Sequence, residues 1–383
     1  MKYIAFYDLP EYASENRSAF PSAIGVVDYM LEVFSSFADV EVISPARTLN
    51  KSGFYRGRTH ILSDKVTLRL PPGFGTKTSL GRLCAVFFTQ LWLFFLLFFG
   101  TKRGEQIVVY HSLSLIPVIS LVKKLKKLIL VGEIREIYSD INKVSPAQRQ
   151  REHEYFTLPD KYIVPSELLN AAVNRSNRPY VIAPGTYRAE PKRAEKFADG
   201  RIHIVYAGTL RREKRGADAA IQTARCLDGR YHVHILGYGS EERIAEIRKS
   251  IAEVSAVTEA KVTYDGLLSG EEFSAFLQSC HIGLSTQDPS GNFNNTSFPS
   301  KVLTYLANGL DVLSANIAAV KDSPVGEYIY YYEKQEPREI ARAIMSIDTT
   351  HPSDKAALLG GLNETLKSEL RGLIIGGSGG NIV

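Results

Sequence analysis

The feature that most constrains the fold is a regular alternation, along the whole chain, of short apolar runs with segments of helix length. In the first half the runs are KYIAFYD, VEVIS, QIVVYHS, LILVGEI, KYIVPS and YVIAPG, and a helix is expected after the first of them, over 22–37. Strands separated by helices in this way are typical of βαβ units with a parallel sheet. The sequence therefore predicts an α/β fold with doubly wound sheets.

The same alternation starts again after residues 186–200, a stretch rich in charge, Pro and Gly that predicts a linker. The second set of runs is RIHIVYAGTL, YHVHILGYGS, KVTYDGLLS, HIGLST, GLDVLSA and EYIYYYE. A chain of 383 residues is long enough for two domains of ordinary size. We therefore predict one domain over 1–185 and another over 201–350, then a C-terminal helix over 351–372 that packs back on the first domain, and a flexible tail over 373–383.

Cysteine usage and the N-terminus indicate the compartment. The three cysteines, Cys84, Cys226 and Cys280, are an odd number and lie far apart, which argues against a disulfide framework or a zinc ribbon. The first residues, MKYIAFYDLPEY, lack the long apolar region of a secretory signal. We expect a reducing, cytosolic setting.

One window of the first half is both basic and apolar. Residues 51–130 hold 13 Lys or Arg and two acidic residues, and within them Leu83–Phe99 is apolar except for Thr89 and Gln90. The segment is long enough to span a bilayer, but a span would place the parts of one sheet on opposite sides of it. A helix buried in the core and a helix lying in one leaflet both remain open. We expect the second, with residues 83–127 facing a membrane surface.

Several well-known functional motifs are missing. The sequence contains no G-x-G-x-x-G with a following acidic residue, no P-loop, no H-E-x-x-H and no G-x-S-x-G. The strand histidines His203, His232, His234 and His281 are joined by no carboxylate or cysteine at ligand spacing, so no metal site is expected. The aromatic residues of the basic window form one block instead of alternating with basic residues, which argues against nucleic-acid binding.

A phosphate-binding arrangement is predicted in the second domain instead. Residues 208–216, GTLRREKRG, form a glycine turn with several basic residues directly after a strand, and residues 295–301, NTSFPSK, precede the helical segment VLTYLANG. Pro299 and Ser300 suit the first turn of that helix, and the free N–H groups at a helix start attract anions. A diphosphate between Arg211, Lys214 and this helix start, with Lys301 beside it, would be neutralised without a metal. Taken singly, each piece also fits a capped helix with solvated arginines.

These stretches resemble the donor domain of GT-B glycosyltransferases, particularly the retaining family 4 type. The matching segments are YAGTLRREKRGAD, LGYGSEE, YDGLLSGEEF and SFPSKVLTYLANGLDVLSA. The first half resembles the acceptor side more weakly, through ENRSAFPSAIGVVDYM, through VVYHS, which places His111 after a strand, and through VGEIREIYSD. The resemblance implies two Rossmann-like doubly wound domains facing a central cleft.

The resemblance and the residue pattern together give a set of candidate site residues. The catalytic candidates are His111, Lys214 and Arg211. The donor-binding candidates are Gly208, Thr209, Gly237, Gly239, Leu268, Ser297, Pro299, Ser300, Lys301 and Thr304. The acceptor-binding candidates are Arg17, Ser22, Gly25 and Glu133.

Two departures from the family pattern matter. Thr209 stands where the family has an arginine, for which Arg211 is close enough to substitute, and Thr296 and Thr304 stand where the family has two glutamates. One of these glutamates ordinarily binds the donor ribose. These replacements keep open a non-catalytic alternative, in which the chain binds nucleotide sugar or glycan and supports another transferase.

The preferred interpretation is a metal-independent, retaining glycosyltransferase that needs no cofactor. The resemblance implies a nucleoside-diphosphate sugar, most simply a UDP-hexose, as donor and a lipid-linked oligosaccharide as acceptor. With the basic apolar window, it implies cell-surface polysaccharide assembly on the cytoplasmic face of the membrane. A GT-B epimerase finds no support in the first domain, and a phosphorylase would need a pyridoxal-phosphate lysine that cannot be assigned.

Overall fold

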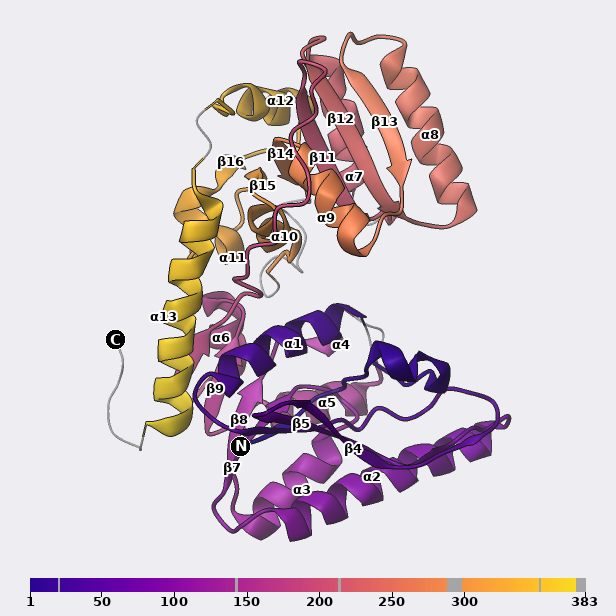
Figure 1. Ribbon diagram of the computed structural model, residues 1–383, viewed down its shortest axis with the longest axis vertical. Helices are drawn as coiled ribbons and strands as arrows, with labels where there is room; N and C mark the ends of the chain where they lie inside the picture. The colour runs from indigo at the N-terminus through magenta and orange to yellow at the C-terminus, as the bar shows by residue number, and fades with distance from the viewer. Residues whose placement is uncertain (20, 142–143, 213–214, 288–297, 351–352, 377–383) are drawn as a thin grey trace. The chain divides into compact units, whose positions relative to one another are not determined.

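The computed structural model describes residues 1–19, 21–141, 144–212, 215–287, 298–350 and 353–376, and of residues 21, 22 and 141 the backbone alone. The chain divides into two compact units (Figure 1). Unit 1 comprises 1–165, 169–183 and 366–383, and unit 2 comprises 166–168 and 184–365. Each unit is built around its own sheet.

Unit 1 contains an eight-stranded sheet in the order β10-β9-β8-β7-β1-β2-β5-β4. Every neighbouring pair is parallel except β4 and β5. The strands are β1 (Lys2–Ile4), β2 (Val40–Ile43), β4 (Arg58–Ser63), β5 (Val66–Leu70), β7 (Gln106–Tyr110), β8 (Ile129–Glu133), β9 (Lys161–Val164) and β10 (Tyr180–Ile182), and a separate pair joins β3 (Phe54–Tyr55) to β6 (Gly73–Phe74). The six strands expected in the first half are all present.

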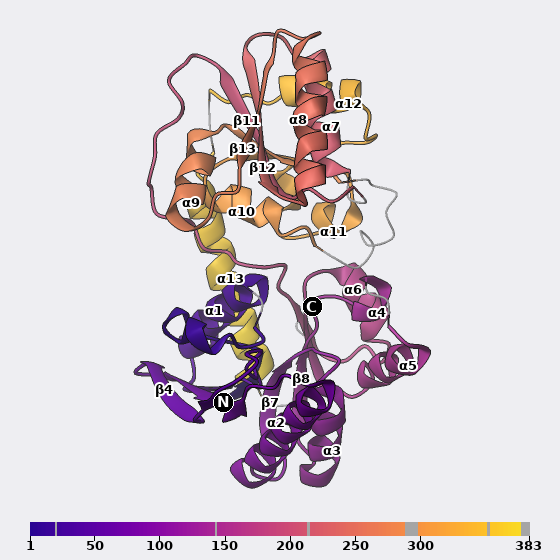
Figure 2. The same ribbon diagram turned by 90° about the vertical axis from the view of Figure 1, so that its right-hand side faces the viewer.

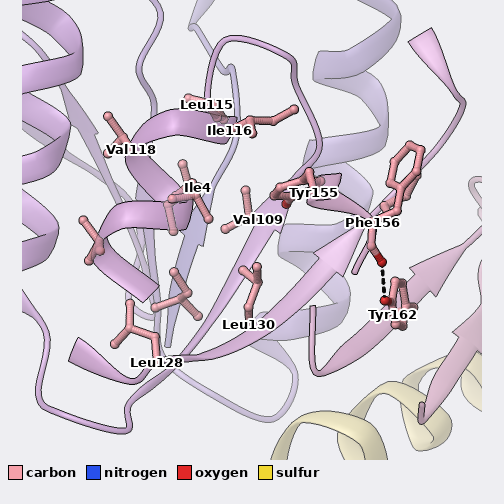
Figure 3. Packing of buried hydrophobic residues seen from close by; sticks show 14 of the residues in the cluster. Ile4, Val109, Leu115, Ile116, Val118, Leu128, Leu130, Tyr155, Phe156 and Tyr162 are labelled. Carbon is pink, nitrogen blue, oxygen red and sulfur yellow. Dashed lines mark hydrogen bonds between the residues drawn. The ribbon is translucent and has the colours of Figure 1, made fainter. Parts of the chain in front are cut away.

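Helices cover this sheet, and its core lies between β7, β8 and α3. The helices are α1 (Pro21–Ser35), α2 (Ser79–Gly100), α3 (Ile116–Lys126), α4 (Tyr138–Ile141), α5 (Pro146–Tyr155) and α6 (Glu167–Val173), with a short helix η1 (Pro10–Glu15) before α1. Figure 3 shows Ile4 and Val109 of the sheet near Leu115 and Ile116 at the start of α3, and Leu130 of the sheet farther from them. Burying apolar side chains of this size contributes about 1.5–3 kcal/mol each.

Helix α2 lies beside α3, as Figures 1 and 2 show, and buries only a narrow stripe. Its buried residues, Ala85, Thr89, Leu93 and Leu97, recur every four residues and therefore lie on one face. Within the described residues, α2 is the one helix long and apolar enough to cross a membrane, yet only 22% of its most apolar window is buried. The helix is therefore not the core helix that remained open from the sequence.

Unit 2 contains a six-stranded, fully parallel sheet in the order β13-β12-β11-β14-β15-β16. The strands are β11 (Ile202–Thr209), β12 (Tyr231–Tyr238), β13 (Lys261–Gly266), β14 (Ile282–Ser285), β15 (Asp311–Ala315) and β16 (Tyr330–Tyr332). All six coincide with the apolar runs of the second half. The order places β11 beside both β12 and β14, so the loops after these three strands lie at the same edge of the sheet.

Helices alternate with the strands of unit 2 as the sequence predicts. They are α7 (Gly216–Thr223), α8 (Glu241–Ser255), α9 (Gly270–Ser279), α10 (Lys301–Ala307), α11 (Ala318–Lys321) and α12 (Pro337–Met345), with short helices η3 (Ala224–Cys226) and η5 (Gly326–Tyr328). Helix α8 begins after Ser240, whose side chain accepts a hydrogen bond from the Arg243 N–H at 3.2 Å. Ser is a favoured residue at this position because it satisfies a free N–H of the first turn.

The last helix, α13 (Lys355–Ile375), is shared between the units. Its first part belongs to unit 2, where Lys355 forms a buried ion pair with Asp311 at 2.8 Å. Its last part belongs to unit 1, where the carbonyls of Leu373 and Ile374 accept hydrogen bonds from Lys161 and Gln106. The helix continues to Ile375, so the tail expected from residue 373 begins too early.

Candidate functional site

The candidate donor site begins where β11 and β12 end. Gly208 and Gly237 are register partners at the carboxyl ends of these strands. Gly237 has a φ of +146°, and a Cβ placed there would collide with the carbonyl oxygen of Gly208. Only glycine fits at Gly237, because its missing side chain lets the Gly208 carbonyl approach the neighbouring strand closely at this end of the sheet.

Lys301, the first residue of α10, reaches this glycine pair. Its Nζ lies over the ring of Tyr206, 4.0 Å from the ring centroid, and only 3.3 Å from where a Cβ of Gly208 would stand. A cation held over an aromatic face is stabilised by the ring quadrupole. Burial raises the pKa of Tyr206 to about 12, so this phenol stays neutral at physiological pH. The structure thus brings two predicted donor-site residues, Gly208 and Lys301, together.

The basic residues of the turn after β11 have different surroundings. Arg211 is exposed, whereas Arg212 is paired with Glu246 and Glu242 of α8. The third predicted cation, Lys214, lies outside the described residues. Of the two catalytic candidates in this turn, Arg211 is therefore the one among the described residues, and its side chain is exposed to solvent.

Arg243 of α8 holds the same turn in place. Its Nε donates to the carbonyl oxygen of Leu210 at 2.7 Å, and its guanidinium pairs with Asp218 at 2.6 Å and Glu246 at 3.0 Å. Gly239 packs against this side chain. Sequence reasoning missed Arg243 because it belongs to a helix more than thirty residues after the turn, and only the fold brings them together.

The helix that was expected to bind the diphosphate starts later than predicted. Pro299 and Ser300 were expected in its first turn, but α10 begins at Lys301 and Ser300 is the residue before the helix. The Ser300 carbonyl accepts the first intrahelical hydrogen bond, from the N–H of Thr304 at 3.1 Å, and the Thr304 hydroxyl donates to the same oxygen at 3.2 Å. Thr304 therefore has its hydroxyl proton engaged within the helix.

The remaining donor candidates lie near the same edge or outside the described residues. Thr209 is the last residue of β11, and the half-buried Leu268 lies in the loop after β13, the strand beside β12. Ser297 and Thr296 lie outside the described residues. The described donor candidates on β11, β12 and β13 therefore lie at one edge of the sheet, because the carboxyl ends of parallel strands meet there, and donor binding stays a prediction.

Two hydroxyl residues at the end of β14 extend the site. Thr286 is buried, and its hydroxyl donates to the carbonyl oxygen of Gly216 at 2.8 Å, while a Cβ on Gly216 would collide with the Thr286 carbonyl. The Ser285 hydroxyl is fully buried and has no hydrogen-bond partner among the described residues. Sequence reasoning missed Ser285 and Thr286, although two hydroxyl residues at the end of the run HIGLST were a signal that could have found them.

In unit 1, His111 follows β7 as predicted, but its side chain is only 1% exposed. Its ring is stacked on Tyr155 and flanked by Tyr138 and Phe156, and its Nε2 lies 3.5 Å from a carboxylate oxygen of Glu152. Burial lowers the pKa of His111 to about 3, so the imidazole is neutral. These are the surroundings of a core residue, and the catalytic role of His111 stays a prediction.

Glu133 ends β8 and is also buried, in a network with two other side chains. One carboxylate oxygen accepts from the Tyr3 hydroxyl at 2.6 Å, and the other accepts from the Arg135 guanidinium at 2.6 and 2.9 Å. A buried carboxylate needs such partners, because an unpaired buried charge is strongly destabilising. Glu133 therefore stabilises the end of β8, and acceptor binding stays a prediction for it.

Of the other acceptor candidates, Arg17 is buried, Gly25 is exposed and the side chain of Ser22 is not described. Arg17 is buried and paired with Glu15 at 2.7 Å, and it also donates to the carbonyls of Ala46 and Pro71. This use of the guanidinium within unit 1 argues against contact with an acceptor phosphate. Gly25 is exposed on α1, with no described atom within 4 Å of where a Cβ would stand, and the side chain of Ser22 lies outside the described atoms.

Comparison with known proteins finds similarity in structure alone. No protein-family model matches the chain, and no curated protein matches its sequence. A structure described as trehalose-6-phosphate from E. coli bound with UDP-2-fluoro glucose is similar with a TM-score of 0.64 and 10% identity, over 98% of both chains. A sucrose-phosphate synthase from Thermosynechococcus elongatus gives 0.60 and 12%, over 98% of this chain and 95% of the other.

A third similar structure is an α,α-trehalose 6-phosphate synthase from Burkholderia multivorans, with a TM-score of 0.57 and 10% identity, covering 100% of this chain and 99% of the other. At such identities the similarity concerns the fold. Because it extends over nearly the whole chain, it includes both parallel-sheet units. The two-domain α/β architecture predicted from the sequence is thereby confirmed, and the chain has the GT-B fold.

Proposed function

We propose that this protein is a retaining glycosyltransferase that takes a hexose from a nucleoside-diphosphate sugar, most simply a UDP-sugar. The observation that carries the proposal is the Lys301 ammonium held beside the bare glycine pair Gly208 and Gly237. It lies at the carboxyl ends of parallel strands, where ligands of such sheets bind. A neighbour of the same fold is described as bound with UDP-2-fluoro glucose, which supports this class of donor.

The chemistry follows from the charge that develops on the leaving diphosphate. Breaking the bond between the anomeric carbon and the phosphate oxygen moves negative charge onto the diphosphate. A fixed ammonium at Lys301 and the side chains of Arg211 and Lys214 stabilise that charge more in the transition state than in the ground state. These groups supply positive charge from the chain itself, so we propose a metal-independent reaction.

Retention of anomeric configuration is proposed through attack from the face that the diphosphate leaves, with the departing phosphate accepting the proton of the incoming hydroxyl. The description of one neighbour, a trehalose-6-phosphate synthase, speaks of glycosyltransfer with retention. Anomeric analysis of the product by NMR tests this step, and an inverted product would reject it.

For the acceptor we propose a lipid-linked oligosaccharide, reached on the cytoplasmic face of a membrane during cell-surface polysaccharide assembly. The support is the outer face of α2, where Leu83, Phe87, Leu91, Phe95 and Phe99 form one exposed stripe. Exposed basic residues accompany it, Lys102 and Arg103 directly after α2 and Lys124 and Lys127 on α3 or just after it. An apolar stripe flanked by lysines and arginines is typical of a helix that lies in a membrane interface.

A soluble sugar phosphate is a second candidate acceptor. The neighbours are described as trehalose-6-phosphate and sucrose-phosphate synthases, which favours it at the level of the fold. One assay distinguishes the two candidate acceptors. Transfer to a membrane lipid extract, with none to a panel of hexose phosphates, supports the lipid-linked acceptor, and the reverse pattern rejects it.

The donor itself is tested with purified protein and a panel of UDP- and GDP-sugars. Slow hydrolysis of one UDP-sugar supports the enzyme. Tight nucleotide binding without turnover of any donor would instead favour a non-catalytic partner of another transferase, the alternative that Thr304 and Thr296 keep open. Absence of any nucleotide binding would reject the donor site.

Lys301→Ala provides the sharper test of the site. Losing a charge-assisted hydrogen bond to the diphosphate should weaken UDP binding on the order of 10- to 100-fold. Lys249→Ala on α8 is the matched control, because Lys249 is an exposed lysine of the same unit that faces solvent. Isothermal titration with UDP measures both, with circular dichroism to confirm folding. Equal affinities for the two variants would place the nucleotide elsewhere.

A further inference from the structure

Three histidines come together on one face of the unit 2 sheet, at the opposite end from the candidate donor site. His203 of β11 and His232 of β12 are register partners, and His234 follows two residues later on the same face. They are 2%, 5% and 3% exposed. One ring nitrogen from each lies within 4.8 Å of the others.

Two carboxylates fix where the protons of this cluster sit. His203 Nε2 lies 2.7 Å from Asp199 Oδ1, and His234 Nδ1 lies 3.0 Å from Asp265 Oδ2. An ionised carboxylate accepts hydrogen bonds only, so each ring places an N–H on these nitrogens. When both rings are neutral, each has a single N–H, and Nδ1 of His203 and Nε2 of His234 carry lone pairs.

These two lone pairs face each other, because His203 Nδ1 and His234 Nε2 are 2.8 Å apart. Two acceptors at hydrogen-bond distance repel each other unless a cation lies at or between them. The site is buried, where such repulsion is little screened by water. The arrangement therefore calls for a positive charge at this point.

His232 supplies a third nitrogen of the same kind. The Thr263 hydroxyl donates to Asp265 at 2.9 Å, so its oxygen is left to accept from His232 Nε2 at 3.0 Å. That bond places the His232 proton on Nε2. Its Nδ1 is buried and has no hydrogen-bond partner among the described residues, so it carries a lone pair as well.

We propose that His203, His232 and His234 form a binding site for a divalent transition-metal ion of the zinc class. Neutral imidazole is a preferred ligand of Zn²⁺, and metal-bound histidines ordinarily donate their other N–H to a carboxylate or similar acceptor. Asp199, Asp265 and Thr263 occupy those outer positions here. Three histidines leave the fourth tetrahedral position to water.

The distance between the facing nitrogens is close to what the ion needs. With Zn–N bonds of about 2.0–2.1 Å, two tetrahedral ligand nitrogens lie roughly 3.3 Å apart. The 2.8 Å between His203 Nδ1 and His234 Nε2 is about 0.5 Å shorter than this value, so the two rings have to move apart by that amount when the ion binds. The expectation of no metal site was based on spacing along the chain. That spacing could not reveal these ligands, because they come from two strands in register and the carboxylates come from flanking segments.

The site is independent of the proposed glycosyl transfer. His203 precedes Gly208 by five residues on β11, which at the rise of a parallel strand is about 16 Å. The ring of Phe197, with its centroid 4.3 Å from that of His203, covers the cluster from the linker side. We therefore assign the ion a structural role, in which it ties β11 to β12 and to the segment before β11.

The experiment uses the full-length chain without an affinity tag, stripped with a chelator and titrated with Zn²⁺ by calorimetry. One equivalent should bind, and the melting temperature should rise. Co²⁺ in place of Zn²⁺ should give the intense visible absorption of a tetrahedral cobalt site. His281→Gln is the matched control. The backbone N–H of His203 donates to His281 Nδ1 at 3.0 Å, and glutamine keeps an acceptor for it while no proposed ligand is removed.

Ligand variants distinguish this site from adventitious metal binding. His203→Asn combined with His234→Gln should weaken Zn²⁺ binding by more than about 100-fold, because two of three ligands are lost. His232→Asn removes one proposed ligand and, besides that, only the contact with Thr263, so it is the variant to use if the double variant fails to fold. The proposal is overturned if the native chain binds no stoichiometric Zn²⁺, or if these variants bind it as tightly as the control. It is likewise overturned if ¹⁵N NMR finds a proton shared by His203 and His234 that Zn²⁺ does not displace.

Discussion

Single residues show how burial decides the role that a sequence motif suggests. His111 and Glu133 both follow strands of unit 1, where functional groups of doubly wound sheets usually lie. Both are nevertheless buried, His111 against aromatic rings and Glu133 against Arg135 and Tyr3. Position along the chain predicted that both residues lie at the carboxyl ends of strands, but it could not predict that both side chains are buried.

The burial of His111 gives a testable dependence of stability on pH. Its pKa falls from about 6.5 in the unfolded chain to about 3 in the folded one. The unfolded state therefore takes up a proton first, and stability decreases as the pH falls from 6.5 towards 3. Between pH 7.5 and 5.5 this group alone should cost about 1.4 kcal/mol.

Urea unfolding of the wild type and of His111→Gln at these two pH values measures that contribution. The difference between the two proteins should shrink by about 1.4 kcal/mol at the lower pH, because only the wild type carries the titrating ring. An unchanged difference would mean that His111 is accessible and protonated in the folded state.

The donor site could be predicted from the sequence only in part, for a physical reason visible in Lys301 and its neighbours. Lys301, Gly208 and Gly237 were found, because glycines at strand ends and a lysine before a helix are local signals. Tyr206 and Arg243 were missed, because their contacts with Lys301 and Leu210 depend on how strands and helices pack. Residue types at strand ends and helix starts can be recognised in the sequence, whereas contacts between distant elements become visible only in the folded structure.

Among the elements, α2 differs most from an ordinary helix of a doubly wound domain. One face packs on the unit through Leu93 and Leu97, while the opposite face exposes large apolar side chains, with Phe87 64% and Phe99 76% exposed. The sequence indicated the apolar content but could not tell which face was covered. This exposure argues against a core helix, and the leaflet-associated helix stays a prediction.

Replacing two residues of the exposed stripe should release the protein from membranes without unfolding it. Phe87→Ser with Phe95→Ser removes two exposed rings and should reduce binding to anionic vesicles at least tenfold, since each buried aromatic contributes about 1.5–3 kcal/mol. Vesicle flotation measures the bound fraction.

Ile61→Ser is the control for this experiment, because Ile61 is an equally exposed apolar residue of β4 in the same unit. It should leave vesicle binding unchanged. Equal binding by the stripe variant and the control would reject the membrane-facing role of α2, and unfolding of the stripe variant alone would show that the stripe is covered.

The antiparallel pair β4 and β5 was not expected from the sequence. In β5 buried residues alternate with half-buried ones, and in β4 half-buried residues alternate with exposed ones, as in strands covered on one face. The parallel strands, buried on both faces, give continuous apolar runs that are easily recognised. In β4 and β5 the alternation includes Arg58, His60 and Arg69, so this segment gives no continuous apolar run.

At the scale of the whole molecule, α13 is the element that both units need. Its residues Leu366, Leu370 and Leu373 are buried in the part assigned to unit 1, although the helix begins in unit 2. The sequence predicted a terminal helix packing back on the first domain, from its position and pattern. The core of unit 1 is therefore completed only when the last residues of the chain are in place.

Leu370→Ala should accordingly destabilise unit 1 in particular. Truncating a fully buried leucine costs about 2–5 kcal/mol, whereas Ile375→Ala on the same helix, 55% exposed, should cost about 0.5 kcal/mol or less. Hydrogen exchange should show faster opening of β7 and β9 while β11 and β12 keep their protection. Equal acceleration in both sheets would mean that the two units unfold together.

The glycine pair at the ends of β11 and β12 also bears on how relatives of this chain can be recognised. The chain shares only 10% identity with a solved structure of the same fold, so overall sequence similarity is a weak guide to relatives. A substitution at Gly237, however, collides with the carbonyl of Gly208 whatever the rest of the chain has become. Distant homologues should therefore keep glycine there on consecutive strands, and this pairing offers a fingerprint that survives when alignment of whole sequences no longer succeeds.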